Sequence, residues 1–154
     1  MKSSSSSTGF SHLDATGNAR MVDVGAKPDS VRVAVAVGRL TCDPTTIRQL
    51  RLQALPKGDV LTVAKIAGVQ AAKATSTLIP LCHPLALTAM EIEFKIETDG
   101  IVVKATARTT GKTGVEMEAL TAVSVTALTL YDMCKAVDKG MSIGGIRVVE
   151  KHKS

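Results

Sequence analysis

Two segments with strand-like sequences, 86–98 and 101–110, are separated only by Asp99 and Gly100. An Asp-Gly pair between two such segments is a strong signal for a tight β-hairpin, because hairpin turns require φ angles that glycine adopts readily. The two segments are therefore predicted to pair as antiparallel strands. This hairpin restricts the chain to folds that contain an antiparallel sheet.

Other segments also carry strand patterns. The alternating run VRVAVAV predicts a strand over 31–40, and a second extended segment is expected at 19–24. A last short strand is predicted at 146–149, followed by a polar tail at 151–153.

Helix signals lie between these strands. Asp43 followed by Pro44 predicts the start of a short helix, because proline tolerates the first helical position, and Pro56 ends it. Asp59 is predicted to cap a second helix that runs to about residue 75. Small residues recur along this helix and predict close approach of a neighbouring element, so we expect the helix to be mostly buried; they are Ala64, Ala67, Gly68, Ala71 and Ala72.

A third helix is predicted over 115–137. Thr113 and Glu116 have the spacing of a capping box, in which each side chain bonds the other residue's backbone N–H, and Gly140 ends the helix. Long helices mixed with antiparallel strands predict an α+β two-layer sandwich.

The size of the chain is that of one domain. Its 154 residues are 45% hydrophobic and 21% charged, which suits a single core. We interpret residues 1–10 as a disordered, serine-rich leader and 11–154 as the domain. The three widely spaced cysteines predict no disulfide framework and favour a reducing, cytoplasmic compartment. The charge-free part of the last helix, 119–131, is shorter than the roughly 20 residues that cross a membrane.

The formal charge of +5 favours an anionic partner. Nucleic acid is disfavoured as that partner, since the lysines are scattered along the chain. Proteins that bind single strands commonly stack bases on aromatic side chains, and here the only aromatic residues are Phe10, Phe94 and Tyr131.

The glycine-rich segment 111–114 precedes the last predicted helix. It is not a Walker nucleotide site, because Thr106 stands where that motif needs a glycine. A plain connector explains the glycines, although free amides at a helix start also attract anions.

Asp132 and Lys135 are three residues apart on the last predicted helix, so they can form an ion pair. Glu118 lies close to a whole number of turns before Asp132 and could share their face. A solvated helix face explains the same charges. Against that interpretation, Lys135 stands among apolar residues, and burial would lower its proton affinity.

His83 lies between Cys82 and Pro84 in a proline-restricted loop. A lone histidine is usually structural, and Cys82 with His83 cannot form a zinc site without further ligands, so no metal site is predicted. Lys57 and Lys73 add positive charge near this loop in the sequence, although surface solubility explains them equally well.

Three motifs resemble the MoaC family of cyclic pyranopterin monophosphate synthases. They are KGDVLTVAKIAGVQAAK at 57–73, LIPLCHPL at 78–85 and TGKTGVEMEALTAVSVTALTLYDMCKAVDK at 110–139. MVDV at 21–24 and Arg32 belong to the same pattern, so the similarity extends over about 11–151.

The resemblance implies a ferredoxin-like subunit in a hexamer of three dimers, with active sites between subunits. It implies conversion of (8S)-3',8-cyclo-7,8-dihydroguanosine 5'-triphosphate into cyclic pyranopterin monophosphate with release of pyrophosphate, which is a phosphorus-oxygen lyase reaction. No cofactor is expected, although a divalent cation could accompany the phosphates.

The family's functional positions fall on residues of this chain. Asp132 matches the catalytic aspartate and Lys135 the lysine beside it. The positions matching substrate-binding or basic active-site residues are Leu81, Cys82, His83, Met117, Glu118, Lys57, Lys73, Arg32 and Lys151. A non-enzymatic binding module for a nucleotide or polyphosphate is the alternative, because it would use the same lysines without the Asp132–Lys135 pair.

Overall fold

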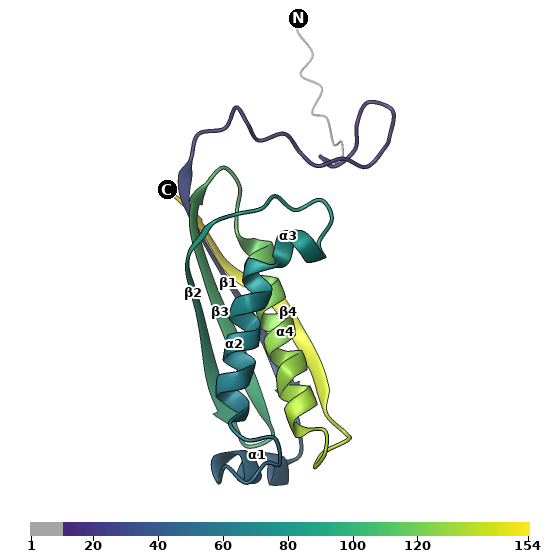
Figure 1. Cartoon of the computed structure of the whole chain (residues 1–154), viewed down its shortest axis with the longest axis vertical. Helices are drawn as coiled ribbons and strands as arrows, with labels where there is room; N and C mark the ends of the chain where they lie inside the picture. Colours follow the sequence, from purple (N-terminus) through teal and green to yellow (C-terminus); the bar gives the residue numbers. More distant parts are fainter. Residues whose placement is uncertain (1–10) are drawn as a thin grey trace, which may run out of the picture.

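A computed structural model describes residues 11–154; the predicted leader at 1–10 lies outside the described residues. The elements follow the order β1 (Ser30–Thr41), α1 (Pro44–Arg51), α2 (Val60–Lys73), α3 (Thr75–Leu78), β2 (Leu87–Glu97), β3 (Gly100–Gly111), α4 (Glu116–Cys134) and β4 (Ser142–Lys153). The strands form one antiparallel sheet in the order β2-β3-β1-β4. Helices α2 and α4 lie side by side on one face of it (Figure 1). The predicted α+β sandwich is confirmed, and its strand order is ferredoxin-like.

The predicted hairpin forms, but it needs its glycine for a reason other than the φ angle. Glu97 pairs with Gly100, and Thr98 and Asp99 form the turn. The φ angle of Gly100 is not positive. A Cβ atom there would lie 2.5 Å from the carbonyl oxygen of Leu40 on β1, so glycine is needed for close strand approach.

The first two helices begin where their caps predict. The side chain of Asp43 accepts a hydrogen bond from the Thr45 N–H at 2.7 Å, directly before α1. The side chain of Asp59 accepts one from the Thr62 N–H at 3.2 Å, before α2. Both predicted N-caps are thus confirmed.

The predicted strand at 19–24 is wrong. Only an isolated bridge between Leu13 and Ala19 forms in this part of the chain. The backbone from residue 22 to 27 instead bonds to side chains: the carbonyl groups of Gly25 and Lys27 accept from Lys112 Nζ at 3.2 and 2.7 Å. The segment 11–29, called the N-terminal arm below, therefore crosses the end of the sheet without joining it (Figure 1).

The last strand is much longer than predicted. β4 includes 151–153, expected to be a polar tail, and Lys151 pairs with Ala34 on β1. β4 is an edge strand whose side chains are mostly exposed. Its residues therefore lack the polar and apolar alternation of a half-buried strand, which is why the pattern failed.

The predicted capping box at the start of α4 is also wrong. The N-cap is Val115, without a side-chain hydrogen bond, and Glu116 contacts Lys151 of β4 instead of Thr113. The helix ends at Cys134, before the predicted residue 137, and Lys135 is its C-cap. A strand distant in sequence thus competes with the local cap for the Glu116 carboxylate.

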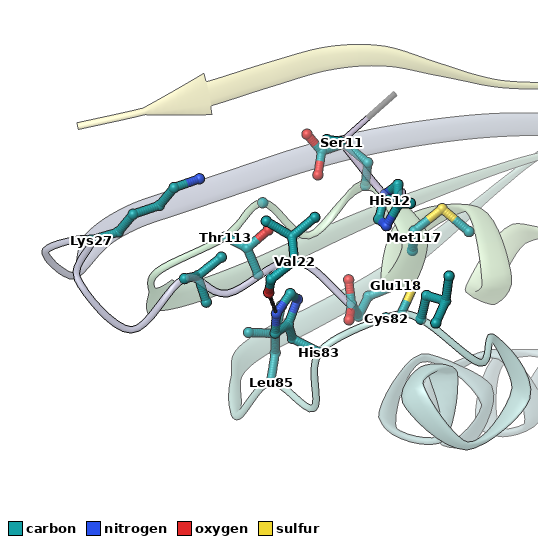
Figure 2. Close-up of a pocket in the computed structure, with 14 residues that line it drawn as sticks. Ser11, His12, Val22, Lys27, Cys82, His83, Leu85, Thr113, Met117 and Glu118 are labelled. Atoms are coloured by element: carbon teal, nitrogen blue, oxygen red, sulfur yellow. Dashed lines mark hydrogen bonds between the residues drawn. The ribbon is translucent and has the colours of Figure 1, made fainter. Parts of the chain in front are cut away.

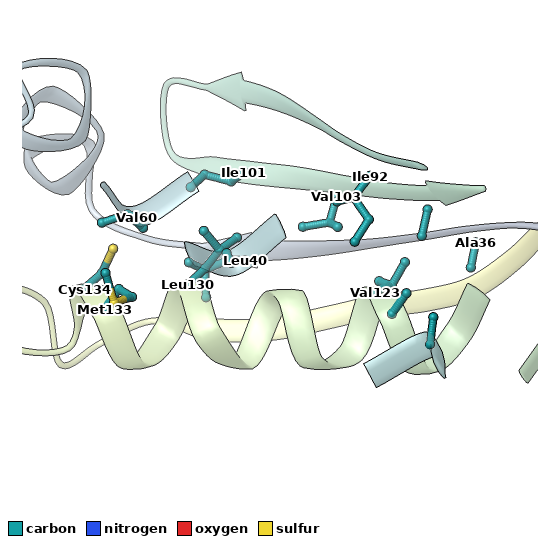
Figure 3. Close-up of a cluster of buried hydrophobic side chains, with 14 of the residues drawn as sticks. Ala36, Leu40, Val60, Ile92, Ile101, Val103, Val123, Leu130, Met133 and Cys134 are labelled. Atoms are coloured by element: carbon teal, nitrogen blue, oxygen red, sulfur yellow. The ribbon is translucent and has the colours of Figure 1, made fainter. Parts of the chain in front are cut away.

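The core lies between the helix layer and the sheet. Leu130 and Val123 of α4 and Leu40, Ile92 and Val103 of the sheet are almost fully buried in it (Figure 3). Small residues let α2 approach α4, as predicted. The outer face of α2 is exposed, however: Ile66 is 54% exposed, so the expectation of a mostly buried helix is wrong for the single chain. No helix within 11–154 is long and apolar enough to cross a membrane.

Candidate active site

A cavity of about 320 Å³ opens beside the first turn of α4. Three segments line it: the N-terminal arm, the loop after α3 and the start of α4 (Figure 2). Five residues predicted from the sequence meet here, namely Leu81, Cys82, His83, Met117 and Glu118. Residues distant in the sequence thus share one pocket.

His83 links the loop to the arm. Its Nε2 lies 2.5 Å from the carbonyl oxygen of Val22 and donates the hydrogen bond, since a carbonyl can only accept (Figure 2). This bond fixes the orientation of the ring and places a proton on Nε2. The prolines on either side, Pro80 and Pro84, restrict the backbone that carries it.

The pocket holds two carboxyl groups in different environments. Burial raises the pKa of Glu118, which is 4% exposed, and the nearby Glu116 carboxylate adds to the increase. Burial also raises the pKa of the Cys82 thiol, with a contribution from Glu118. Burial opposes ionisation of Glu116 as well, but hydrogen bonds from Lys151 and from the Glu116 backbone, together with the charges of Lys151 and Arg32, outweigh it and lower the pKa of Glu116. Environments that separate two carboxyl pKa values in this way are typical of catalytic pockets.

Positive charge adjoins the start of α4. Lys151 Nζ contacts the Glu116 carboxylate, and Arg32 of β1 lies close enough to help lower the pKa of that carboxyl group. Lys73 ends α2 and is exposed. The structure thus places Arg32 and Lys151 beside the pocket, while Lys73 stands at the same end of the helix layer (Figure 1).

A second cluster lies at the opposite end of α4. The carboxylate of Asp132 contacts Lys135 Nζ at 2.7 Å and Lys57 Nζ at 2.8 Å. The hydrogen bonds from Lys135 and Lys57 lower the pKa of Asp132 to about 2, and the bond to Asp132 raises the pKa of Lys135. The Asp132–Lys135 pair is confirmed. The expected loss of proton affinity by Lys135 is wrong for the single chain, because its side chain is 55% exposed.

The two clusters do not meet within one chain. Glu118 and Asp132 are fourteen residues apart on α4, and at 1.5 Å per residue the rise between them is about 21 Å. A shared helix face therefore does not place Glu118 beside the Asp132–Lys135 pair.

Sequence reasoning missed the part of the arm that lines the pocket. Ser11, His12 and Lys27 all border the cavity. No local pattern marks them, because the arm has neither helix nor strand periodicity. MVDV, the arm segment matched to the family, was the only available signal.

No group of three or more metal-ligating side chains lies together within 11–154. A cation carried by the phosphates of a ligand is a separate question that stays a prediction.

Comparisons with known proteins agree with the motifs. The model of the MoaC family matches residues 21–154. A protein of Roseiflexus sp. (strain RS-1) named cyclic pyranopterin monophosphate synthase is 57% identical over 144 residues, which are 92% of this chain and 91% of that protein. One of the same name from Oleidesulfovibrio alaskensis is 55% identical over 147 residues, 94% of this chain and 92% of that protein.

A further relative has a different architecture. The molybdenum cofactor biosynthesis bifunctional protein of Chlorobaculum tepidum is 60% identical over 142 residues, which cover 92% of this chain but 46% of that protein. Identity at this level over nearly the whole chain, together with the family match and the pocket formed by its motifs, establishes that this chain belongs to the MoaC family.

Proposed function

We propose that this chain is a cyclic pyranopterin monophosphate synthase of molybdenum cofactor biosynthesis. It would convert (8S)-3',8-cyclo-7,8-dihydroguanosine 5'-triphosphate into cyclic pyranopterin monophosphate and pyrophosphate. The observation that carries this proposal is the pocket in which the LCHPL and GVEMEAL motifs meet, in a chain 57% identical to a relative of that name.

The pocket suits the two parts of this substrate. Leu81, Cys82 and Met117 offer apolar and sulfur surface, and Glu118 and His83 offer hydrogen-bonding groups, for the ring system. Arg32 and Lys151 beside it supply positive charge for the phosphates and for the departing pyrophosphate. Fixed cations of this kind stabilise the charge that develops during phosphoryl chemistry.

We assign proton transfer to Lys135, oriented by Asp132. The low pKa of Asp132 keeps its carboxylate ionised, so it holds the Lys135 ammonium group in place and does not itself donate a proton. Lys135 would then donate and recover protons as the ring opens and recloses. A lower proton affinity for Lys135 would follow if a partner chain covered the pair, since burial disfavours the ammonium form.

The distance between the clusters supports an active site shared between chains. One small substrate cannot reach both Glu118 and Asp132 of the same chain across about 21 Å. A homohexamer of three dimers would bring the halves together, if one chain supplied the pocket with Lys73 and another chain supplied Asp132, Lys135 and Lys57. The exposed face of α2, with Val63 and Ile66, is available for such contacts.

Three further parts of the proposal rest on the same residues. The substrate is a small triphosphate, so neither nucleic acid nor a membrane is a required partner. The described basic residues can carry the phosphate charge without a cofactor, and a divalent cation could share it. The free thiols of Cys42, Cys82 and Cys134 suit a reducing cytoplasm.

Incubation of the purified chain with the cyclised intermediate tests the activity. We expect release of pyrophosphate and formation of the pyranopterin product. Lys135→Ala should lower the rate by about a hundredfold or more, as loss of a general acid does, while the melting temperature is kept. Lys65→Ala removes an exposed lysine of α2 and is the matched control. Binding of the intermediate without pyrophosphate release would favour the binding-module alternative.

Mixing two inactive variants tests the shared site. Chains of Lys135→Ala and His83→Ala, unfolded together and refolded as mixed assemblies, should regain part of the activity, since some sites then combine an intact pocket with an intact lysine. A solution mass six times that of the 16.1 kDa chain is expected for the assembly. Absence of recovery in verified mixed hexamers would place the site within one chain.

A further inference from the structure

Glu116 is a carboxylate at a site proposed to bind a triphosphate. It lines the same pocket as His83 and Glu118, and its side chain is only 25% exposed. A negative charge there repels the phosphates, so its presence calls for a physical reason. The start of α4 explains part of it, because a helix N-terminus stabilises a carboxylate.

The stronger reason is the pair of cations from two strands. Lys151 of β4 contacts the Glu116 carboxylate directly, and Arg32 of β1 acts on it through its charge. Arg32 has donors to spare: its Nε is buried without a hydrogen-bond partner among the described residues, and its Nη2 makes only a 3.4 Å contact with the Lys112 carbonyl oxygen. The carboxylate thus bonds one cation and lies near a second that has unused hydrogen-bonding capacity.

Gly114 makes room for this arrangement. A Cβ atom at residue 114 would lie 2.2 Å from Oε2 of Glu116, so only glycine lets the carboxylate fold back into this position. The φ angle of Gly114 is not positive, so alanine could adopt the same backbone. The glycine is therefore required by the position of the Glu116 side chain.

We propose that Glu116 is a positioning residue that acts as a displaceable counterion: its carboxylate holds Lys151 in place beside Arg32 and gives way to a phosphate group of the substrate. Carboxylate and phosphate oxygens accept hydrogen bonds from the same donors, so one can replace the other between these cations. This inference rests on the proposed function for the identity of the incoming anion.

The assignment differs from a role in proton transfer. The contact with Lys151 keeps Glu116 ionised at neutral pH, which suits a counterion and not a proton donor. Glu118 lies two residues further along the same helix, where burial raises the pKa of its carboxyl group. The two glutamates of the motif therefore have separate tasks.

The test compares anion binding and kinetics of the full chain with Glu116→Gln. Tripolyphosphate binding, measured by calorimetry, should become about tenfold tighter, since a competing charge is removed while the shape is kept. In turnover, KM and kcat should both fall, because the phosphates bind more tightly and pyrophosphate leaves more slowly. Unchanged or weaker tripolyphosphate binding by a folded variant would overturn the proposal.

Two further variants make the test specific. Glu91→Gln removes the same charge from the exposed face of β2, on the side of the sheet away from the helices, and should leave tripolyphosphate binding unchanged. Gly114→Ala keeps the carboxylate but displaces it, so tripolyphosphate binding should again tighten; if Glu116→Gln does not fold, this variant decides. Because tripolyphosphate binding needs no turnover, failure of the counterion proposal is distinguishable from failure of the proposed function.

Discussion

Substitution of Gly68 by alanine tests how closely the two long helices must approach. Gly68 lies in the middle of α2, where a Cβ atom would be 2.0 Å from Thr126 Oγ1 of α4 and 2.5 Å from Ile92 Cδ1 of β2. The backbone carbonyl of Ala122 is 3.1 Å away and cannot rotate aside. Helix α2 would therefore have to move away from α4.

Two opposing effects set the size of the change. Overpacking of a close-packed core destabilises a protein by about 1–3 kcal/mol. Alanine in place of glycine within a helix recovers up to about 1 kcal/mol. The net loss should be about 1–2 kcal/mol, and for a chain of this length each kcal/mol shifts the melting temperature by about 2–4 °C. We expect Gly68→Ala to melt about 2–8 °C below the parent protein.

Thermal unfolding followed by circular dichroism measures this difference at one fixed chain concentration, because association would make the melting temperature depend on concentration. Gly144→Ala is the matched control, since no atom lies within 4 Å of a Cβ there and its φ angle is not positive. A Gly68→Ala protein as stable as the parent would refute the packing argument.

A compensating substitution makes the reasoning sharper. Thr126→Ala removes the atom that lies closest to the new Cβ, and the Thr126 hydroxyl has no hydrogen-bond partner among the described residues. Alone it should destabilise the fold by about 1 kcal/mol, through the lost methyl group. The double variant with Gly68→Ala should lose less stability than the two single variants together, by about 1 kcal/mol or more. Simple additivity would show that the two positions do not meet.

Three other predictions concern the hydrogen bonds of Asp138, the ion pair Lys57–Asp132 and two buried thiols. Asp138→Asn should lower stability by about 1 kcal/mol at pH 7, because hydrogen bonds, first from the Asp43 N–H, hold the pKa of Asp138 below its ordinary value of 3.8. A depressed carboxyl pKa stabilises the fold above 3.8 and stops doing so as pH falls through the lower folded value, so urea unfolding of the two proteins should converge in acid. Lys57→Gln should lower turnover at least about tenfold while the melting temperature changes little, since exposed ion pairs such as Lys57–Asp132 contribute little to stability. Burial raises the pKa of Cys42 and Cys134 to about 11, so iodoacetamide at pH 8 should label them only after unfolding, as mass spectrometry would show.

The sequence by itself determined the features that depend on near neighbours. The caps Asp43 and Asp59, the hairpin at Asp99 and the pair Asp132–Lys135 all involve residues no more than three positions apart. Short-range geometry favours such contacts wherever no distant group competes for the same side chain. The sequence also identified the family, because three whole motifs resembled those of the MoaC family.

Only the tertiary structure decided which distant residues meet. The contacts of Lys57 with Asp132, His83 with the Val22 carbonyl, and Lys151 with Glu116 depend on sheet register and helix packing. The contact between Lys151 and Glu116 also removed the capping box that the local pattern predicted. The tertiary structure also separated the candidate site into two clusters at opposite ends of α4, since a helix that places two residues on one face still moves them apart by 1.5 Å per residue.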